Sequence, residues 1–416
     1  MANAATSNAD RAVAPVGDVS GAFAVDAEGL ERVIRSLIAD ELASARGLRS
    51  LQVESLDWEA DAPLKEGGLE LDSLELYDAA ARVNQFFRMH EAGIEDYLLL
   101  EPTIARWVEV VTKSLEMKFE RLSFMTSGST GASKTCTHEF SDLVRDAVFI
   151  GDLVAPARVV TLVPPHHIYG FIYGVLTPIA AGVSVIDARA TSPGALRAAL
   201  RPGDLIVATP FLFRHLLRAM ERFPVGVVGL CSTSPLTDER GAALGAAGLH
   251  RIYEVYGSSE TCGVGWRRVG DAAFRAFPWR RVVAEGDGAV VEAGRPRAST
   301  MDALDVNEAA QTFKVVARRD GAVQIGGTNV FPDAVAATLR RAPGVREAAV
   351  RVVNAEDGAR ARLKAFVTPQ PGVSPEDAKR AAAAQCTDEL PAPARPSVID
   401  VGDALPRNEV GKLADW

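Results

Sequence analysis

Apolar residues recur three or four positions apart through residues 26–115, the spacing that places side chains on one face of an α-helix. The first of these stretches surrounds Leu30 and the last surrounds Trp107. The positions are Leu30, Val33, Ile34, Leu37, Ile38, Ile104, Trp107, Val108 and Val111. We therefore predict a small all-helical domain over residues 26–115, which we call the head.

From Leu122 onward the pattern changes to short runs rich in β-branched residues, with helical stretches between them. The runs read VVTLVP, VSVID, LIVATP, GVVGL and IYEVYG, and the helical stretches include GALRAALR and RHLLRAM. This alternation is typical of an α/β sheet domain, predicted here over residues 119–318. Residues 321–416 read helix, strand, strand, helix, strand, which predicts a small α+β domain.

Two further segments indicate where in the cell the protein resides. Residues 1–25 are small and polar and lack the basic and apolar regions of a secretory signal, so we expect a disordered leader. The longest apolar run, from Gly170 to Ile186, is short for a bilayer span and is interrupted by Pro178. We expect it to form a buried helix followed by a strand, and we expect no membrane association.

Composition narrows the class of protein. Hydrophobic residues make up 48% and charged residues 24%, as in globular proteins, and a net charge of -9 offers no basic surface for nucleic acid. The cysteines Cys136, Cys231, Cys262 and Cys386 lie far apart, without the spacing of a zinc site or a disulfide framework. We place the protein in a reducing cytoplasm.

A loop of Gly, Ser and Thr follows the first strand of the α/β domain. Residues 124–135 read FMTSGSTGASKT. Glycines allow backbone amides to approach phosphate oxygens, hydroxyl groups add donors, and Lys134 adds positive charge. The spacing of Gly128, Gly131 and Lys134 differs from the GxxxxGK[ST] loop of P-loop enzymes, which argues against that class of ATPase or kinase. A flexible surface turn is the structural alternative.

Further motifs accompany this loop. TSGSTGASK is similar to the signature of the adenylate-forming superfamily, which includes acyl-CoA synthetases, aryl-acid ligases and peptide-synthetase adenylation domains. VPPHHIYG resembles its aromatic and histidine motif, YGSSET its YGxTE motif, RRDGAVQIGGTNVFPDAV its hinge, and LPRNEVGK its terminal PRxxxGK motif. With five motifs in the family's order, the chain is identified as a member. The resemblance implies an α/β fold with a small mobile C-terminal domain.

The same resemblance implies ATP-dependent activation of a carboxylic acid to acyl-AMP, followed by transfer to a thiol. Like charges on the acid and the α-phosphate must be brought together, so the site has to supply positive charge. The implied catalytic residues are Lys412, which would bridge both groups, Lys134, and Glu260, which would hold Mg²⁺. A solvated tail lysine is the alternative for Lys412.

The resemblance also implies the residues that hold ATP. Tyr256 offers an aromatic face to adenine, with a core tyrosine as the alternative. Asp302 is assigned to the ribose hydroxyls, although the family's usual TGD reads Thr300, Met301, Asp302 here, which leaves Asp305 open. The ATP-binding residues are Thr126, Ser127, Gly128, Ser129, Thr130, Gly131, Tyr256, Ser259, Asp302 and Arg318.

The acyl group and the domain rotation have their own residues in this resemblance. His166, His167 and Tyr169 would line the acyl pocket, together with Ser232 and Gly257, whose small size admits a ring or a chain. A histidine after Pro-Pro that only caps a loop is the alternative for His167. Asp320 stands at the family's hinge, beside Gly321. Gln324 replaces a lysine common in acyl-CoA and aryl-acid ligases, which puts any contact from that position in doubt.

The head has a resemblance of its own. GGLELDSLELYDAAARVNQFF is similar to the core of an acyl carrier domain, with Ser73 at the serine that takes 4'-phosphopantetheine. The structural alternative is helix capping, with Asp72 as N-cap and Glu75 three residues later. We expect a carrier-like fold and leave both interpretations of Ser73 open.

The α/β domain is short for the family, because a long subdomain usually precedes the phosphate loop. Such a truncated domain would expose one face of its sheet, so we expect the head or a second subunit in a homo-oligomer to cover that face.

Function remains open between two classes. The first is a ligase using ATP and Mg²⁺ to join a small carboxylic acid, aromatic or aliphatic, to its own carrier domain, a separate acyl carrier protein or coenzyme A. The second is a non-catalytic scaffold that binds nucleotide or carrier proteins. Lys134, Glu260 and Lys412 favour the first.

Overall fold

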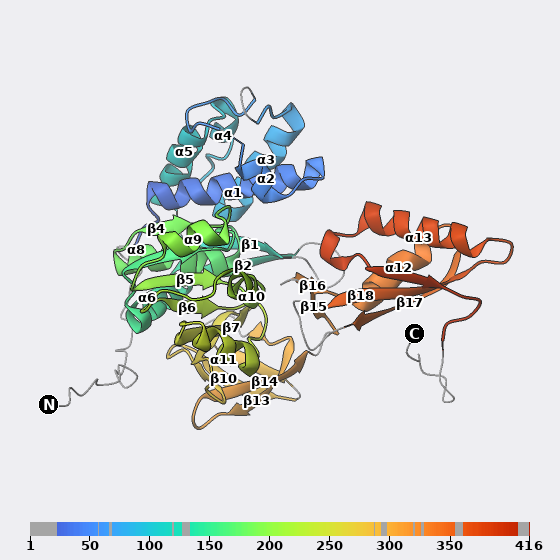
Figure 1. Cartoon of the computed structure of the whole chain (residues 1–416). Coiled ribbons are helices and arrows are strands. Elements are labelled where there is room, and N and C mark those ends of the chain that lie inside the picture. Colours follow the sequence, from blue (N-terminus) through green and yellow to red (C-terminus); the bar gives the residue numbers. More distant parts are fainter. Residues whose placement is uncertain are drawn as a thin grey trace.

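The computed structural model describes residues 23–56, 58–65, 69–118, 120–126, 134–286, 288–292, 298–318, 321–325, 328–353, 361–406 and 416. Figure 1 shows the head helices above a central sheet and a smaller unit with its own strands and helices at the right. Within the described part of the chain, no helix is both long and apolar enough to cross a membrane.

The head consists of helices, as its apolar spacing predicts. They are α1 (Ala27–Arg46), α2 (Ser50–Glu54), α3 (Ser73–Phe87), η2 (Met89–Glu91), α4 (Tyr97–Leu100) and α5 (Ile104–Met117). The Asp26 carboxylate caps α1 by accepting the amide hydrogen of Gly29, and α1 ends at Gly47 in the left-handed conformation. Asp72 and Glu75 form a capping box at the start of α3, so this part of the capping prediction is confirmed.

A nine-stranded sheet forms the centre of the molecule, in the order β13-β14-β9-β8-β7-β6-β5-β3-β4. The strands are β3 (Arg158–Thr161), β4 (Val185–Asp187), β5 (Asp204–Ala208), β6 (Val228–Cys231), β7 (Arg251–Ser258), β8 (Cys262–Arg268), β9 (Phe274–Ala276), β13 (Asp302–Asn307) and β14 (Thr312–Arg318). The half from β4 to β7 is parallel, and the pairs from β7 to β13 are antiparallel. All five runs named above for their β-branched residues form strands of the parallel half.

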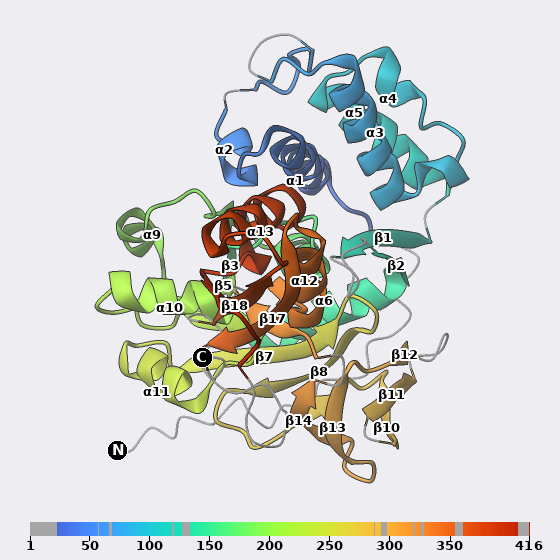
Figure 2. The ribbon, with the colours of Figure 1, turned by 90° about the vertical axis from the view of Figure 1, so that its right-hand side faces the viewer.

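Helices cover the parallel half, as expected for buried parallel strands. They are α6 (Phe140–Val154), α7 (Ile168–Phe171), the π-helical turn η3 (Ile172–Leu176), α8 (Thr177–Ala181), α9 (Pro193–Ala199), α10 (Pro210–Ala219) and α11 (Asp238–Ala246). In Figure 2, α9, α10 and α11 lie together on one side of the molecule. The apolar run from Gly170 to Ile186 forms a buried helical stretch and then β4, which confirms the expectation for that segment.

Two smaller sheets flank the large one. β1 (Arg121–Thr126) and β2 (Lys134–Glu139) form a hairpin whose strands flank the segment predicted to bind phosphate. A three-stranded sheet contains β10 (Arg281–Glu285), β11 (Gly288–Glu292) and β12 (Ala298–Ser299).

The C-terminal unit follows the predicted order of helix and strand. It contains β15 (Val323–Ile325), β16 (Thr328–Val330), α12 (Pro332–Arg341), β17 (Val345–Val353), β18 (Arg362–Pro369), α13 (Pro375–Glu389), η4 (Ala392–Ala394) and β19 (Val398–Val401). Its buried residues form a core of their own between Ile325 and Ile399. The hairpin of β15 and β16 is an addition that the sequence pattern does not predict.

One hydrophobic core joins the head to the sheet domain. It contains Leu37 of α1, Phe86 of α3 and residues as far along the chain as Phe277. The Phe86 ring lies 5.1 Å from that of Phe124 and 5.6 Å from that of Phe171, in edge-on contacts typical of packed aromatic groups. The described head residues thus cover apolar surface of the sheet domain, as expected.

Candidate active site

The residues predicted to line the acyl pocket lie at the carboxyl ends of parallel strands. The hydroxyl of Tyr169 donates to the carbonyl of Ala208 at 3.1 Å and to that of Leu230 at 2.8 Å, at the ends of β5 and β6. The Ser232 hydroxyl donates to the carbonyl of Val255 in β7 at 2.8 Å. This is the edge at which open α/β sheets bind their ligands.

Backbone contacts at this edge are close. A Cβ atom on Gly170 would lie 2.0 Å from the carbonyl oxygen of Pro164, so only glycine fits directly after Tyr169. Burial raises the pKa of Tyr169 well above its usual range, which keeps its hydroxyl protonated as a donor. His167 precedes α7 with an exposed side chain, and its ring lies 4.3 Å from that of His166.

Two residues predicted to hold the nucleoside contact each other. The Tyr256 hydroxyl donates to Oδ2 of Asp302 at 2.7 Å, and the Tyr256 ring packs 5.2 Å from that of Phe313. Asp302 also pairs in register with Arg318 across β13 and β14. Asp302 therefore lies beside Tyr256, whereas Asp305 is exposed further along β13. The roles of these residues in binding ATP stay predictions.

Glu260 lies on a tight turn between β7 and β8. The Ser258 hydroxyl accepts the amide hydrogens of Glu260 and Thr261, both at 3.2 Å, which leaves the Glu260 side chain exposed. Ser259, on the same turn, offers its carbonyl oxygen to His138 Nε2 at 2.6 Å. The pKa of His138 is lowered by burial, which favours a neutral ring that donates this hydrogen bond.

The donor set at this turn fits Mg²⁺. Among the described residues no group of three or more His, Cys, Asp or Glu could enclose a metal ion. Mg²⁺ in nucleotide sites commonly takes one or two carboxylates and completes its shell with phosphate oxygens and water. One exposed carboxylate on a well-fixed turn therefore matches what a magnesium-bound nucleotide needs from a protein.

The ends of the predicted phosphate loop meet across a hairpin. Thr126 in β1 pairs in register with Lys134 in β2, and the Lys134 side chain is exposed. The loop between them, with Ser127, Gly128, Ser129, Thr130 and Gly131, lies outside the described residues, as do Asp320 and Lys412. Gly321, beside the predicted hinge, has a φ of 68°, a left-handed conformation that suits glycine.

Ser73 is the first residue of α3 and is exposed, with Lys65 Nζ 3.5 Å from its hydroxyl. Ser73 thus has the accessible hydroxyl that modification would need, and the capping box beside it is also present. Both interpretations of Ser73 therefore stay open.

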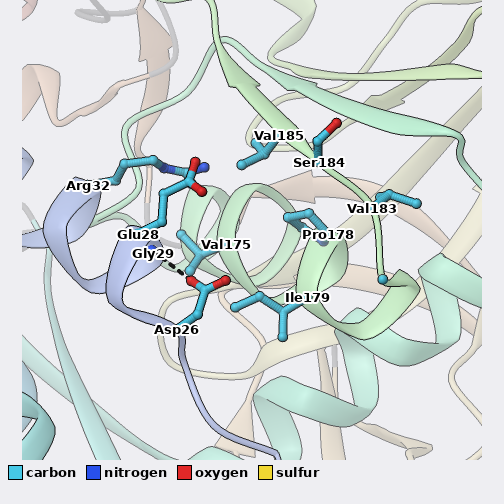
Figure 3. Close-up of a pocket in the computed structure, with 11 residues that line it drawn as sticks. Asp26, Glu28, Gly29, Arg32, Val175, Pro178, Ile179, Val183, Ser184 and Val185 are labelled. Carbon is cyan, nitrogen blue, oxygen red and sulfur yellow. Dashed lines mark hydrogen bonds between the residues drawn. The ribbon is translucent and has the colours of Figure 1, made fainter.

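A cavity in the described part of the chain lies away from these residues. It has a volume of about 270 Å³ and opens between the start of α1 and the stretch from Val175 to Val185, with Asp26, Glu28 and Arg32 on the α1 side (Figure 3). None of the residues predicted to bind ATP or the acyl group lines this cavity.

Sequence reasoning missed three polar contacts around the site. They involve His138 on β2, the buried Asp146 on α6, and His166, whose Nδ1 lies 2.9 Å from the Ser36 hydroxyl of the head. Their partners are more than a hundred positions away in the sequence, so no local pattern marks them. The adjacent histidines at 166 and 167 were the one available signal.

Comparison with known proteins agrees with this architecture. The model of AMP-binding enzymes matches residues 122–332, and that of the AMP-binding enzyme C-terminal domain matches residues 334–412. Fold and motifs thus define an adenylate-forming enzyme of the acid–thiol ligase class. The chain belongs to the family of AMP-binding enzymes.

Two curated relatives match nearly end to end. A 4-coumarate–CoA ligase from Halorhodospira halophila is 35% identical over 393 residues, covering 94% of this chain and 99% of the relative. A 4-coumarate–CoA ligase from Rhodobacter capsulatus is 36% identical over 398 residues, covering 92% and 100%. The truncation relative to the wider superfamily stays a prediction.

The solved o-succinylbenzoate CoA synthetase from Bacillus subtilis shares the fold with a TM-score of 0.62 at 17% identity, covering 92% of this chain and 91% of that one. This likeness confirms the predicted fold class of a mixed α/β protein with a helical N-terminal region and a small C-terminal domain.

Proposed function

We propose that the protein activates a small carboxylic acid with ATP and Mg²⁺ and transfers the acyl group to the thiol of coenzyme A. The observation that carries this proposal is that residues assigned to the acid, the nucleoside and Mg²⁺ all lie along one edge of the sheet. Tyr169 and Ser232 lie at the ends of β5 and β6, Tyr256 bonds Asp302, and Glu260 lies on the turn after β7.

The reaction has two steps. A carboxylate oxygen of the acid attacks the α-phosphorus of ATP, and the bond to the bridging oxygen breaks, so acyl-AMP and pyrophosphate form. The thiol then attacks the acyl carbon and AMP leaves with the bonding electrons, while the thiol proton passes to solvent. Glu260 would hold Mg²⁺ against the phosphates, and Lys134 and Lys412 would offset the charge that the first step brings together.

The acid is proposed to be aromatic. Both curated relatives named above are 4-coumarate–CoA ligases, and the residues predicted for the acyl pocket are the aromatic Tyr169 and the small Ser232 and Gly257, which lie at or near the carboxyl ends of parallel strands. A flat ring fits between an aromatic side chain and small residues. We place the reaction in a reducing cytoplasm, which is consistent with four free cysteines.

Exchange of labelled pyrophosphate into ATP tests the first step. Purified protein with Mg²⁺ would be assayed against a panel of aryl acids and fatty acids, with coenzyme A added in a second series to follow thioester formation. We expect exchange that depends on aryl acids. Folded protein that shows no exchange with any acid would instead support a scaffold that binds nucleotide without turnover.

A second candidate acceptor is 4'-phosphopantetheine on Ser73. Its support is the exposed hydroxyl at the start of α3, next to the exposed apolar side chains Leu74 and Tyr77. Intact-mass analysis after incubation with coenzyme A and a phosphopantetheinyl transferase would detect a loaded arm, and Ser73→Ala would remove it. Retention of full coenzyme A ligase activity in Ser73→Ala, with no mass gain in the wild type, would leave coenzyme A as the acceptor.

A further inference from the structure

A fully buried carboxylate lies behind the turn that carries Glu260. Asp146, on α6, is 0% exposed. Its Oδ2 accepts the amide hydrogen of Gly263 at 3.1 Å and lies 3.3 Å from the Cys262 thiol, which donates to it. Its Oδ1 accepts the indole hydrogen of Trp279 at 3.2 Å.

The charge in this cluster is costly to bury. Desolvation raises the pKa of Asp146 to about 6, and the nearby Arg280 guanidinium acts in the opposite direction. Arg280 is itself buried, and its Nε donates to the carbonyl of Gly263 at 3.0 Å. Both Asp146 and Arg280 therefore bond the same residue, Gly263, from its two sides. Arg280 also pairs with Asp142 at 3.7 Å. Buried charged groups contribute little net stability compared with apolar packing, which points to a role of Asp146 beyond stability.

The backbone at this point is also strained. Cys262 has a φ of 59°, a left-handed conformation that few residues with a side chain adopt. A Cβ atom on Gly263 would lie 2.2 Å from Oδ2 of Asp146, and one on Gly257 would lie 2.2 Å from the carbonyl oxygen of Cys262. The pairing of β7 with β8 shifts register between Tyr256 and Gly257. Such strain persists only where surrounding contacts hold it.

We infer that Asp146 is a positioning residue for the magnesium–nucleotide site. Its carboxylate bonds Cys262 and Gly263, the first two residues of β8. In this way it fixes the β8 end of the turn that carries Ser259 and Glu260. His138 holds the same turn through the Ser259 carbonyl, so the turn is fixed from both sides. The inference rests on the proposed function, because it gives the turn its use in binding nucleotide.

Asp146→Asn tests the inference, because it keeps the shape of the side chain and removes its charge. One carboxylate oxygen becomes an NH₂ group that cannot accept from the donors facing it. Calorimetric titration would compare binding of ATP with Mg²⁺ and binding of AMP without Mg²⁺. We expect Asp146→Asn to weaken binding of ATP with Mg²⁺ about tenfold or more, and binding of AMP less than about twofold.

The matched control is Asp152→Asn, because Asp152 lies on the same helix and is exposed. It should leave both affinities unchanged. Hydrogen–deuterium exchange of residues 257–264 provides a readout independent of ligand, and it should become faster in Asp146→Asn but not in Asp152→Asn.

A second pair of variants keeps the inference testable if Asp146→Asn fails to fold. Cys262→Ser retains a donor to Oδ2 and should bind ATP as the wild type does, while Cys262→Ala loses the donor and should bind several-fold more weakly. Equal loss of ATP and AMP binding in Asp146→Asn, or no loss of either, would overturn the inference. Wild-type protein that binds nucleotide but shows no exchange would sink the proposed catalysis and leave the role of Asp146 standing.

Discussion

The hydrogen bond between His138 and the Ser259 carbonyl connects two motifs that are far apart in the sequence. His138 lies near the end of β2, the strand that follows the predicted phosphate loop, and Ser259 lies on the Glu260 turn. A neutral imidazole with its hydrogen on Nε2 supports this contact, whereas alanine would leave the carbonyl without its partner. The distance between the Glu260 turn and the strand after the predicted phosphate loop therefore depends on a side chain that neither motif includes.

Variants of His138 should separate the hydrogen bond from the rest of the ring. We expect His138→Ala to raise the KM for ATP about tenfold, the typical effect of losing a buried hydrogen bond. His138→Gln, which can donate from Nε2, should stay within about threefold of wild type. Steady-state kinetics with the best acid provides the measurement, and an unchanged KM in His138→Ala would show that the contact does not position the site.

The pH dependence of stability follows from the same residue. Burial lowers the pKa of His138 in the folded state, so the unfolded chain binds a proton more readily. The neutral contact therefore stabilises the fold fully above the ordinary histidine pKa of about 6.5, and this contribution is lost as the pH falls below it. Urea unfolding at pH 7.5 and 5.5 should show that wild type loses more stability on acidification than His138→Gln does. The raised pKa of Asp146 makes its own contribution to stability increase as the pH falls. This contribution is the same in wild type and His138→Gln, so it cancels when the two proteins are compared.

At the residue scale, the sequence predicts contacts between residues that are close together along the chain. The capping box of Asp72 and Glu75 spans three residues and follows from their spacing alone. Tyr256 and Asp302 were both assigned to the nucleoside and do contact each other. The bonds of Asp146 and His138 to the β7–β8 turn depend on how α6 and β2 pack against the sheet, which no local spacing encodes.

At the scale of the elements, the head helices are held against the sheet domain, because the two share one hydrophobic core. Besides the apolar contacts, Arg32 Nη2 donates to the Gly174 carbonyl at 2.6 Å, and Arg189 bonds Glu54 at 2.7 Å. The first bond ties α1 to η3, a few residues after Tyr169, and the second ties α2 to the residues that follow β4. A head held in this way cannot move away from the sheet domain unless these bonds and the shared core contacts break.

The shared core predicts a single unfolding transition for the head and the sheet domain. Phe86→Ala should lower the free energy of unfolding by about 3–5 kcal/mol, the usual cost of removing a buried phenyl group. Leu100→Ala, on the same head but 73% exposed, should change it by less than about 0.5 kcal/mol. Urea unfolding followed by tryptophan fluorescence reports both regions, through Trp107 in the head and Trp266 in the sheet. A head that unfolds separately would contradict a common core.

Strands were predicted unevenly, for a physical reason. The parallel strands are buried on both faces and read as continuous apolar runs, as in β5, where every residue is buried. The antiparallel strands are partly exposed, and β13 reads Asp-Ala-Leu-Asp-Val-Asn, with charged residues at exposed or half-buried positions. Such a pattern resembles a loop, so the half of the sheet that carries Asp302 was not predicted as strands.

On the scale of the whole molecule, the C-terminal unit has a separate core and carries Lys412, which lies outside the described residues. The sequence pattern predicts the order α12, β17, β18, α13 and β19 in this unit, and it misses the hairpin of β15 and β16. The sequence predicts that either the head or a second subunit covers the apolar face of the sheet domain. It does not distinguish the two, because either would bury the same apolar residues.

Lys412→Ala tests whether the C-terminal unit supplies the charge for the first step. We expect it to lower acid-dependent pyrophosphate exchange at least about a hundredfold, because a lysine that bridges both reactants acts mainly in the transition state. Thioester formation from added acyl-AMP and coenzyme A should change much less. Lys379→Ala, an exposed lysine on α13 of the same unit, is the matched control. Exchange at the wild-type rate in Lys412→Ala would remove this residue from the mechanism.

The common core of head and sheet also constrains how the protein is made. Leu37 and Phe86 leave the ribosome well before Phe277, a member of the same core, which lies 240 positions after Leu37 and 191 after Phe86. At about 5–20 residues per second, the apolar faces of α1 and α3 wait about ten seconds or longer for the surface that buries them. A chaperone that binds exposed apolar helices would therefore have its main opportunity during translation, before the sheet is complete.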